Sequence, residues 1–355
     1  MQRVLWLDGI RAVAIILVLF THVHECFGLG HGALEGDNSV RVLEASFCYA
    51  VSRNGVPFFL MISGALLLAR DVSNKHWYEA IRLKRILDFI FLAFLYCVVT
   101  NIIEQIINGS ELKNSVLLAL IKNNILLGNV GYGIQFWFIG AIIPLYLSIP
   151  FLQLYLKNSK NLSGVTIYAA CTVILFLLLP NSLRNHSLLK IMDKGIFSVY
   201  VLYFVIGYIS VTKSEFINIM NTFLKKYFFI IPFTVLFVMG ISLFHPTYHR
   251  QLTWYATSFS ILIISTVSFS LLKQYFTAFN WNKHPAFTQG VLLLAKYSWG
   301  MFLSHYIFLW ILKKYSWRSG IAGVDVLINL IILILISFGY VHLMEKSKYT
   351  RWLVS

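Results

Sequence analysis

Apolar segments long enough to cross a membrane follow one another along the chain, and this repetition limits what the chain can fold into. A spanning helix needs about 20 consecutive, mostly apolar residues, and in lipid only helices and closed barrels satisfy every backbone hydrogen bond. The segments predict an all-α integral membrane protein with about ten transmembrane helices in a single bundle. They lie near residues 4–24, 51–69, 86–107, 132–153, 164–180, 195–212, 227–244, 254–272, 291–312 and 324–344.

The composition excludes an ordinary soluble domain. Hydrophobic residues make up 58% of the chain and charged residues only 12%, whereas soluble domains are about half apolar and a quarter charged. The net charge of +15 does not indicate a nucleic-acid partner, because lysine and arginine lie mostly in short segments between the apolar runs. Basic residues in such places orient helices and contact anionic membrane lipid. Segment 112–127 is shorter and mixed, and it fits an interfacial helix.

The basic residues also predict an orientation. An even number of spans places both termini on one side, and with cytoplasmic termini the inner segments hold 16 lysines and arginines against 11 in the outer segments. This excess favours termini in the cytoplasm. We therefore expect a multi-pass protein of the cytoplasmic (inner) membrane. Residues 1–355 would form one membrane domain without a separate soluble domain.

The first apolar segment carries two ionisable residues that a spanning helix does not need, Arg11 and His22. Eleven helical steps of about 100° bring them to within roughly 20° of one face, about 16 Å apart along the axis. Ionisable groups are costly to bury in a membrane helix, so each is a functional hypothesis by default. With cytoplasmic termini, Arg11 lies toward the cytoplasm and His22 toward the outside.

His22 is a candidate general base. Histidine can accept a proton near neutral pH, which suits the activation of a hydroxyl group. Glu25 follows three residues later on nearly the same face, and it could hold one imidazole nitrogen while the other faces a substrate. The alternative is that His22 only marks the outer end of the helix, which is what we expect of the neighbouring His24.

Three arginines are candidate anion contacts, because a guanidinium binds phosphate through two parallel hydrogen bonds. Arg11 could instead be neutralised by Asp8, three residues earlier. Arg82 and Arg85 stand where the third predicted helix enters the membrane from the inside, and their spacing places them on one helix face. Ordinary positive-inside anchoring is the simpler explanation of this second pair.

Other polar residues give weaker signals. His305 lies in the outer half of the ninth predicted helix, among aromatic side chains that fit packing or an interfacial belt. Ser63 and Gly64 would let a neighbouring helix approach the second helix closely. Glu345 is near the inner end of the last helix and is expected to belong to a solvated tail.

Segment 25–50 is expected to form an acidic, glycine-containing outer loop. Cys26 and Cys48 both fall in it, and they could form a disulfide if the loop faces an oxidising compartment. No cysteine pair has the Cys-x-x-Cys spacing of a metal site, so we expect no metal.

Taken together, the motifs resemble the membrane acyltransferase 3 family, whose members O-acylate cell-surface glycans. The central motif is Arg-x10-His on the first helix, formed here by Arg11 and His22. The similarity continues in order through the chain. Its other elements are Leu-Asp-Gly-Ile-Arg-Ala at 7–12, Val-Pro-Phe-Phe-Leu-Met-Ile-Ser-Gly at 56–64, Arg82-x-x-Arg85, Phe136-Trp137-Phe138 with Tyr146 and Pro150, residues 297–306, and Glu345-Lys346.

Two positions depart from the family pattern. Leu87-Asp88 follow the arginine pair where the family often has a proline, and Ser347 follows Glu345-Lys346 where a proline is also common. Neither change removes a proton carrier or a cation, so they affect local geometry more than chemistry.

The resemblance implies a membrane-bound O-acyltransferase whose donor substrate is a cytoplasmic acyl-CoA, expected to be acetyl-CoA. The acceptor would be a hydroxyl of a cell-surface or lipid-linked glycan such as O-antigen lipopolysaccharide or exopolysaccharide. The implied roles are catalytic for His22 and Glu25, donor-binding for Arg11, Arg82 and Arg85, and further candidates at Asp8, Ser63, Trp137, His305 and Glu345. The three arginines would gather on the inner side, with the pantetheine arm extending outward to His22.

Alternatives stay open at this point. Ten spans with intramembrane charges also fit a proton-coupled transporter or flippase of a glycan precursor, although the sequence contains no internal repeat. An inactive scaffold that binds glycan enzymes is a third function. For a transferase, His22 would act either as the base in direct transfer or as a nucleophile that forms an acyl-histidine.

Overall fold

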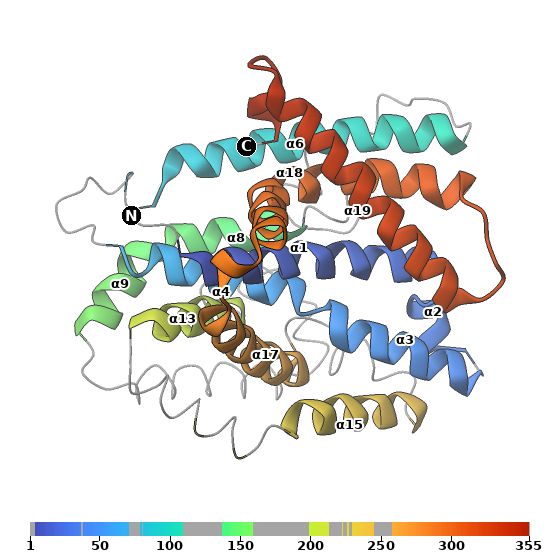
Figure 1. Ribbon diagram of the computed structural model, residues 1–355, viewed down its shortest axis with the longest axis horizontal. Coiled ribbons are helices and arrows are strands. Elements are labelled where there is room, and N and C mark those ends of the chain that lie inside the picture. Colours follow the sequence, from blue (N-terminus) through green and yellow to red (C-terminus); the bar gives the residue numbers. More distant parts are fainter. Residues whose placement is uncertain are drawn as a thin grey trace, which may run out of the picture. The chain divides into compact units, whose positions relative to one another are not determined.

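The computed structural model describes residues 4–36, 38–70, 79, 81–108, 137–158, 199–212, 222, 226, 229–244 and 258–354. Every regular element within these ranges is a helix, as the sequence predicts (Figure 1). The predicted interfacial helix at 112–127 and the predicted span at 164–180 lie outside the described residues.

Five helical stretches in the described part of the chain are long and apolar enough to cross a membrane. Four of them correspond to predicted spans, and the fifth combines two consecutive helices, α3 and α4. The total of ten spans and the cytoplasmic termini stay predictions. The helices concerned are α1 (Leu5–Cys26), α3 (Ser39–Ser52) with α4 (Gly55–Leu67), α6 (Leu83–Asn108), α17 (Phe259–Ala278) and α19 (Ala322–Lys346).

Further helices cover other predicted spans. The predicted span at 132–153 is described from residue 137 onward, and there it consists of two helices that meet at Ser148 rather than one. α8 contains Pro144, which has no backbone N–H to continue the helical pattern. These helices are α8 (Trp137–Leu147), α9 (Ile149–Asn158), α13 (Val199–Thr212), α15 (Ile230–Phe244) and α18 (Pro285–Tyr315), with the short η4 (Trp281–Lys283) and η5 (Arg351–Leu353).

The prediction of an outer loop at 25–50 is wrong, because α2 (His31–Leu34) and most of α3 occupy it. Asn38 starts α3: its side-chain oxygen accepts hydrogen bonds from two backbone N–H groups of the first turn, at 3.1 and 3.2 Å. Such a cap satisfies donors that a helix start leaves unpaired. Buried Val42, Ala45 and Tyr49 then recur at helical spacing, so α3 buries one face.

The chain forms two compact units that are interleaved in the sequence. The first contains Met1–Phe59, Val99–Leu112 and Ile219–Ser355, and the second contains Leu60–Val98 and Lys113–Asn218. Neither unit is one continuous stretch of chain, so the division does not follow from a linker.

In the described part of the first unit, α1 packs most extensively against four helices. They are α3, α17, α18 and α19, so the first helix of the chain contacts the last three long ones (Figure 1). Gly9 allows the close approach of α17, because a Cβ at this position would collide with the ring of Phe276. Buried polar side chains on a helix enclosed in this way need hydrogen-bond partners on neighbouring elements. Such partners are found near the C-terminal end of α1.

In the second unit α4 and α13 cross at short range. A Cβ on Gly64 would collide with the backbone carbonyl of Phe204, and one on Gly207 with that of Met61. The close approach predicted for Gly64 is therefore confirmed. The amide of Gln153 on α9 donates to three backbone carbonyl oxygens that follow α4, at 2.9, 3.0 and 3.3 Å, and so holds its C-terminal end.

Candidate active site

His22, near the end of α1, is the centre of a cluster of polar side chains. Its Nδ1 lies 3.4 Å from Oε2 of Glu25 and 3.1 Å from the hydroxyl of Tyr306 on α18. The contact with Glu25 follows from helical spacing, as predicted. The contact with Tyr306 exists because α1 and α18 pack side by side. The His22 side chain is only 10% exposed, so these contacts fix the orientation of its ring.

Glu25 is held in turn by Arg53. Nη2 of Arg53 donates to Oε1 of Glu25 at 2.7 Å, and the guanidinium lies over the ring of Tyr49 with 5.1 Å from Cζ to the ring centroid. Arg53 sits at the C-terminal cap of α3, so the packing of α1 on α3 brings the two together. A guanidinium next to a part-buried carboxylate compensates its charge. Arg53, Glu25 and His22 therefore form an ordered chain of contacts.

A second imidazole lies against the first. The rings of His22 and His305 are stacked, with centroids 5.3 Å apart and 28° between the planes. Nδ1 of His305 donates to the carbonyl oxygen of Phe302 at 2.7 Å. The side chain is completely buried, and its Nε2 has no hydrogen-bond partner among the described residues. Such unsatisfied buried atoms are rare in native proteins and call for a functional or solvent-based explanation.

The contacts engage Nδ1 of His22 and leave its Nε2 without a described partner. When Nδ1–H donates to the carboxylate of Glu25, the lone pair of the neutral ring lies on Nε2. In the described part of the chain nothing is hydrogen-bonded to this Nε2. An imidazole with one nitrogen oriented by a carboxylate and the other unengaged is suited to act as a general base.

His24 differs from the idle interfacial residue that the sequence suggested. It is completely buried; its Nδ1 donates to the carbonyl oxygen of Leu29 at 2.9 Å, and its Nε2 accepts from the hydroxyl of Ser52 at 3.0 Å. The ring also packs edge-on against Tyr49, with centroids 4.6 Å apart. His24 therefore ties the end of α1 to the following turn and to α3, and both of its nitrogens are used.

A match to a known family covers nearly the whole chain. The family model, described as an acyltransferase domain and belonging to acyltransferase 3, matches residues 4–342. The chain belongs to the acyltransferase 3 family. With its long apolar helices it is a multi-pass membrane acyltransferase, and the resemblance of its motifs is confirmed. The comparisons with curated proteins and with solved structures gave no significant match.

In this acyltransferase Arg11 lies toward the other end of α1 and pairs with Asp8. The distance from Nη1 of Arg11 to Oδ1 of Asp8 is 3.3 Å, and the two side chains are 28% and 9% exposed. The predicted i,i+3 pair is thus confirmed. A guanidinium has five N–H donors and this contact uses one of them, so pairing with Asp8 is compatible with a second, anionic partner.

Arg82 and Arg85 lie in the second unit, where α6 begins. The prediction that they share one helix face is wrong, because Arg82 precedes the helix and has a φ of +57°. Non-glycine residues seldom adopt this conformation. The carbonyl oxygen of Arg82 accepts hydrogen bonds from the N–H groups of Arg85 at 2.8 Å and Ile86 at 3.2 Å. Arg82 therefore precedes α6 and accepts the first hydrogen bonds of this helix.

The arginine pair has a third cation near it that the sequence did not single out. Burial lowers the pKa of the Arg82 guanidinium, and the nearby charges of Arg85 and Arg70 lower it further. Cations that destabilise one another in this way would be stabilised by a bound anion. Arg11 belongs to the first unit, so the gathering of Arg11 with Arg82 and Arg85 stays a prediction.

The remaining predicted residues are distributed over several helices. Glu345 is not part of a solvated tail, since it forms an ion pair with Lys296 of α18 and its side chain is 21% exposed. Ser63 is half-buried on α4, and Trp137 is the first residue of α8.

Both cysteines of the region 25–50 are free thiols in the structure, so the disulfide left open by the sequence is not formed. Cys26 ends α1 and Cys48 is buried on α3. Among the described residues, no group of three or more His, Cys, Asp or Glu side chains could hold a metal ion.

Sequence reasoning missed two members of the His22 cluster. They are Arg53, at the C-terminal cap of α3, and Tyr306 on α18. Their contacts join residues separated by 28 and 284 positions. Arg53 lies directly before Asn54-Gly55, between the end of α3 and the start of α4. This position between two helices is the sequence feature that could have identified it.

Proposed function

We propose that this protein is an O-acyltransferase of the cytoplasmic membrane that transfers an acyl group, with acetyl-CoA as donor, to a hydroxyl of a cell-surface or lipid-linked glycan. One observation carries the proposal: in a member of the acyltransferase 3 family, the imidazole of His22 is oriented through Nδ1 and leaves Nε2 unengaged. A sugar hydroxyl is a weak nucleophile, and a base that removes its proton during attack lowers the barrier.

In the proposed step, Nε2 of His22 takes the proton of the acceptor hydroxyl while its oxygen attacks the thioester carbonyl. A carbon–oxygen bond forms, the carbon–sulfur bond breaks, and CoA leaves as a thiolate that receives the proton from the imidazolium. The carboxylate of Glu25, 3.4 Å from Nδ1, stabilises the imidazolium while it exists. Arg53 keeps this carboxylate in place through its 2.7 Å hydrogen bond.

In this proposal the arginines bind the acyl donor. Arg11 is on the same continuous helix as His22, about 16 Å away along the axis, a depth that an extended pantetheine arm can bridge. Arg82 and Arg85, with Arg70 beside them, supply cations for the phosphates of CoA. The proposal therefore assigns phosphate recognition to the arginines and proton transfer to the opposite end of α1.

An acyl-histidine relay is the second form of the same function. In that case His22 itself attacks the thioester and hands the acyl group to the acceptor in a second step. Incubation with labelled acetyl-CoA but without acceptor, followed by mass spectrometry of the peptide containing His22, separates the two forms. An acetylated peptide supports the relay, and an unmodified peptide in a preparation that is active with acceptor supports direct transfer.

The proposed function is tested by transfer of label from radioactive acetyl-CoA to the cell's own surface glycan, catalysed by the purified protein in lipid nanodiscs. We expect labelled glycan with the wild type, none with His22→Ala, and full transfer with His284→Ala, which removes an exposed histidine far along the sequence. Absence of labelled glycan with the wild type, combined with passage of glycan precursor across vesicles that contain the protein, would contradict the proposal and indicate a transporter.

A further inference from the structure

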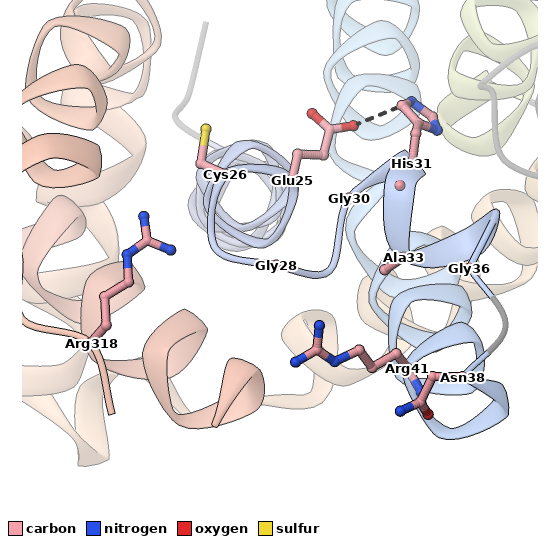
Figure 2. A pocket seen from close by; sticks show the side chains of 11 residues that line it. Glu25, Cys26, Gly28, Gly30, His31, Ala33, Gly36, Asn38, Arg41 and Arg318 are labelled. Carbon is pink, nitrogen blue, oxygen red and sulfur yellow. Dashed lines mark hydrogen bonds and ion pairs between the residues drawn. The ribbon is translucent and has the colours of Figure 1, made fainter. Parts of the chain in front are cut away.

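A cavity of about 530 Å³ lies directly beside the cluster, at the end of α1 that carries His22 (Figure 2). Glu25 and Cys26 line it from α1, His31 lines it from α2, and Arg41 lines it from α3. Arg318 completes it from the segment between α18 and α19. Its volume falls within the range of about 300–1,000 Å³ that is typical of small-molecule sites.

Glycines keep this cavity open. Gly28 has a φ of +97°, and so allows the sharp turn after α1 that residues with a side chain rarely make. Gly32 lines the cavity from α2, and a Cβ added there would meet no atom within 4 Å. A side chain at position 32 would therefore fit without a clash.

The lining of the cavity is positively charged. Glu25 is its one carboxylate among the lining residues, and Arg53 compensates that charge at 2.7 Å. Arg41 and Arg318 are not compensated in the same way, because neither forms an ion pair with a described residue. Figure 2 shows the two arginines on opposite sides of Gly28. Two guanidinium groups with spare donors favour an oxyanion between them.

The surroundings of Arg318 leave its charge available. Its Nη2 donates to the carbonyl oxygen of Lys313 at 3.4 Å, and its Cζ lies 4.8 Å from the centroid of the Phe27 ring. The charge of the acidic neighbour Asp325 interacts with that of Arg318 without a direct ion pair, and its carboxylate accepts hydrogen bonds from the backbone N–H and the hydroxyl of Ser319, each at 2.7 Å.

We propose that this cavity binds the acceptor saccharide through an anionic group, a carboxylate or a phosphate, held by Arg41 and Arg318. The proposal rests on the proposed function, because it assigns the cavity to the acceptor of the same reaction. Glu25 lines the cavity and contacts Nδ1 of His22, so the cavity adjoins the His22 cluster through this carboxylate, and His22 itself is not one of the lining residues. The acceptor class is then an acidic or phosphorylated glycan, as opposed to a neutral one.

Binding is measured first, on the full-length protein in nanodiscs, with three fluorescently labelled probes of similar size. They are a disaccharide containing glucuronic acid, a disaccharide phosphate and a neutral disaccharide. We expect the wild type to bind at least one anionic probe and not the neutral one. Preference for the carboxylate would indicate an acidic sugar, and preference for the phosphate would indicate a phosphorylated or lipid-diphosphate-linked acceptor.

Two kinds of variant locate the binding. Arg41→Gln and Arg318→Gln should each weaken binding of the anionic probe about tenfold, the effect of one charge-assisted contact, whereas the exposed Lys348→Gln should not. Gly32→Leu should block the cavity for the anionic probe without unfolding the protein. Gly290→Leu is its matched control, since a Cβ there also meets no atom within 4 Å and Gly290 does not line the cavity.

Equal binding of neutral and anionic probes, or unchanged binding by Arg41→Gln, Arg318→Gln and Gly32→Leu, would overturn the inference. Its failure is distinguishable from failure of the proposed function. If transfer to native glycan needs His22 but is unchanged by these three variants, the proposed function holds and the assignment of the cavity to the acceptor is wrong. If the protein binds the anionic probe through Arg41 and Arg318 but transfers no label, the cavity does bind anions and the proposed function is wrong.

Discussion

The last two turns of α1 hold two buried histidines whose surroundings differ in one decisive respect. His24 uses both ring nitrogens, one toward the carbonyl of Leu29 and one toward the hydroxyl of Ser52. In the described part of the chain His22 engages only Nδ1, toward Glu25 and Tyr306. Both residues are buried histidines, so residue type and burial do not separate them. The number of engaged ring nitrogens does, and it is the basis for proposing His22 as the base.

The contacts of His24 also support the contacts of His22. His24 ties α1 to the turn that follows it and to α3, and α3 ends at Arg53, the residue that holds Glu25. His24 thus holds the segment that positions Arg53, and Arg53 holds the carboxylate that contacts His22. We expect substitutions at the two positions to have opposite consequences for rate and for stability.

The largest effect is expected for His22→Ala. Loss of a general base lowers the rate by about 10²- to 10⁴-fold, while the melting temperature of the purified protein should stay near that of the wild type. Transfer of labelled acetyl groups and a thermal unfolding curve on the same preparation provide both readouts. A variant that keeps its rate would show that Nε2 of His22 is not the base.

Glu25→Gln should have the next largest effect. The amide keeps the shape of the side chain but removes the charge that orients and stabilises the imidazole, and it leaves Arg53 without its carboxylate; we expect a loss of about 10²-fold in kcat. Glu44→Gln, on the exposed face of α3, is the control. If Glu25→Gln and Glu44→Gln transfer label at the same rate, the carboxylate has no part in catalysis.

His24→Ala tests the other half of the comparison. The carbonyl of Leu29 and the hydroxyl of Ser52 lose their partner in a buried place, which should lower the free energy of unfolding by about 1–3 kcal/mol. Activity per folded molecule should change far less than in His22→Ala. Thermal unfolding in detergent, with His284→Ala as the control for an exposed histidine, measures the shift. A destabilisation no larger than that of the control would mean that the two hydrogen bonds of His24 do not support the fold.

The smallest effect is expected for Tyr306→Phe. The hydroxyl is a second neighbour of Nδ1 of His22, at 3.1 Å, and Glu25 remains when it is removed. We expect a reduction in kcat of about two- to tenfold, the value of one hydrogen bond, with an unchanged KM for acetyl-CoA. Complete loss of transfer would identify Tyr306 as a proton carrier in its own right.

Part of this site can be predicted from sequence because it is local. The pairs Arg11 with Asp8 and His22 with Glu25 follow from helical spacing, and so does the existence of a long first helix. The correct family also follows, because the order of the short motifs spans the chain.

The rest depends on contacts between distant residues. Arg53 reaches Glu25 across 28 positions, and Tyr306 reaches His22 across 284, so only the packing of α1 on α3 and α18 brings them together. The expectation that His24 only marks a helix end is wrong for the same reason, because its hydrogen bond to Ser52 also joins distant residues. Segment 25–50 falls between two predicted spans and is therefore expected to be a loop, whereas burial of Val42, Ala45 and Tyr49 on one face makes α3 a helix.

Removal of the glycan hydroxyl proton by His22 is best examined by mass spectrometry of surface glycans. The cells lack the chromosomal copy of this protein and carry either the wild type or His22→Ala, at equal abundance in the membrane. We expect a glycan with an added, base-labile acyl group in the wild type and an unmodified glycan in the variant. An acylated glycan in the cells with His22→Ala would show that His22 is not the base.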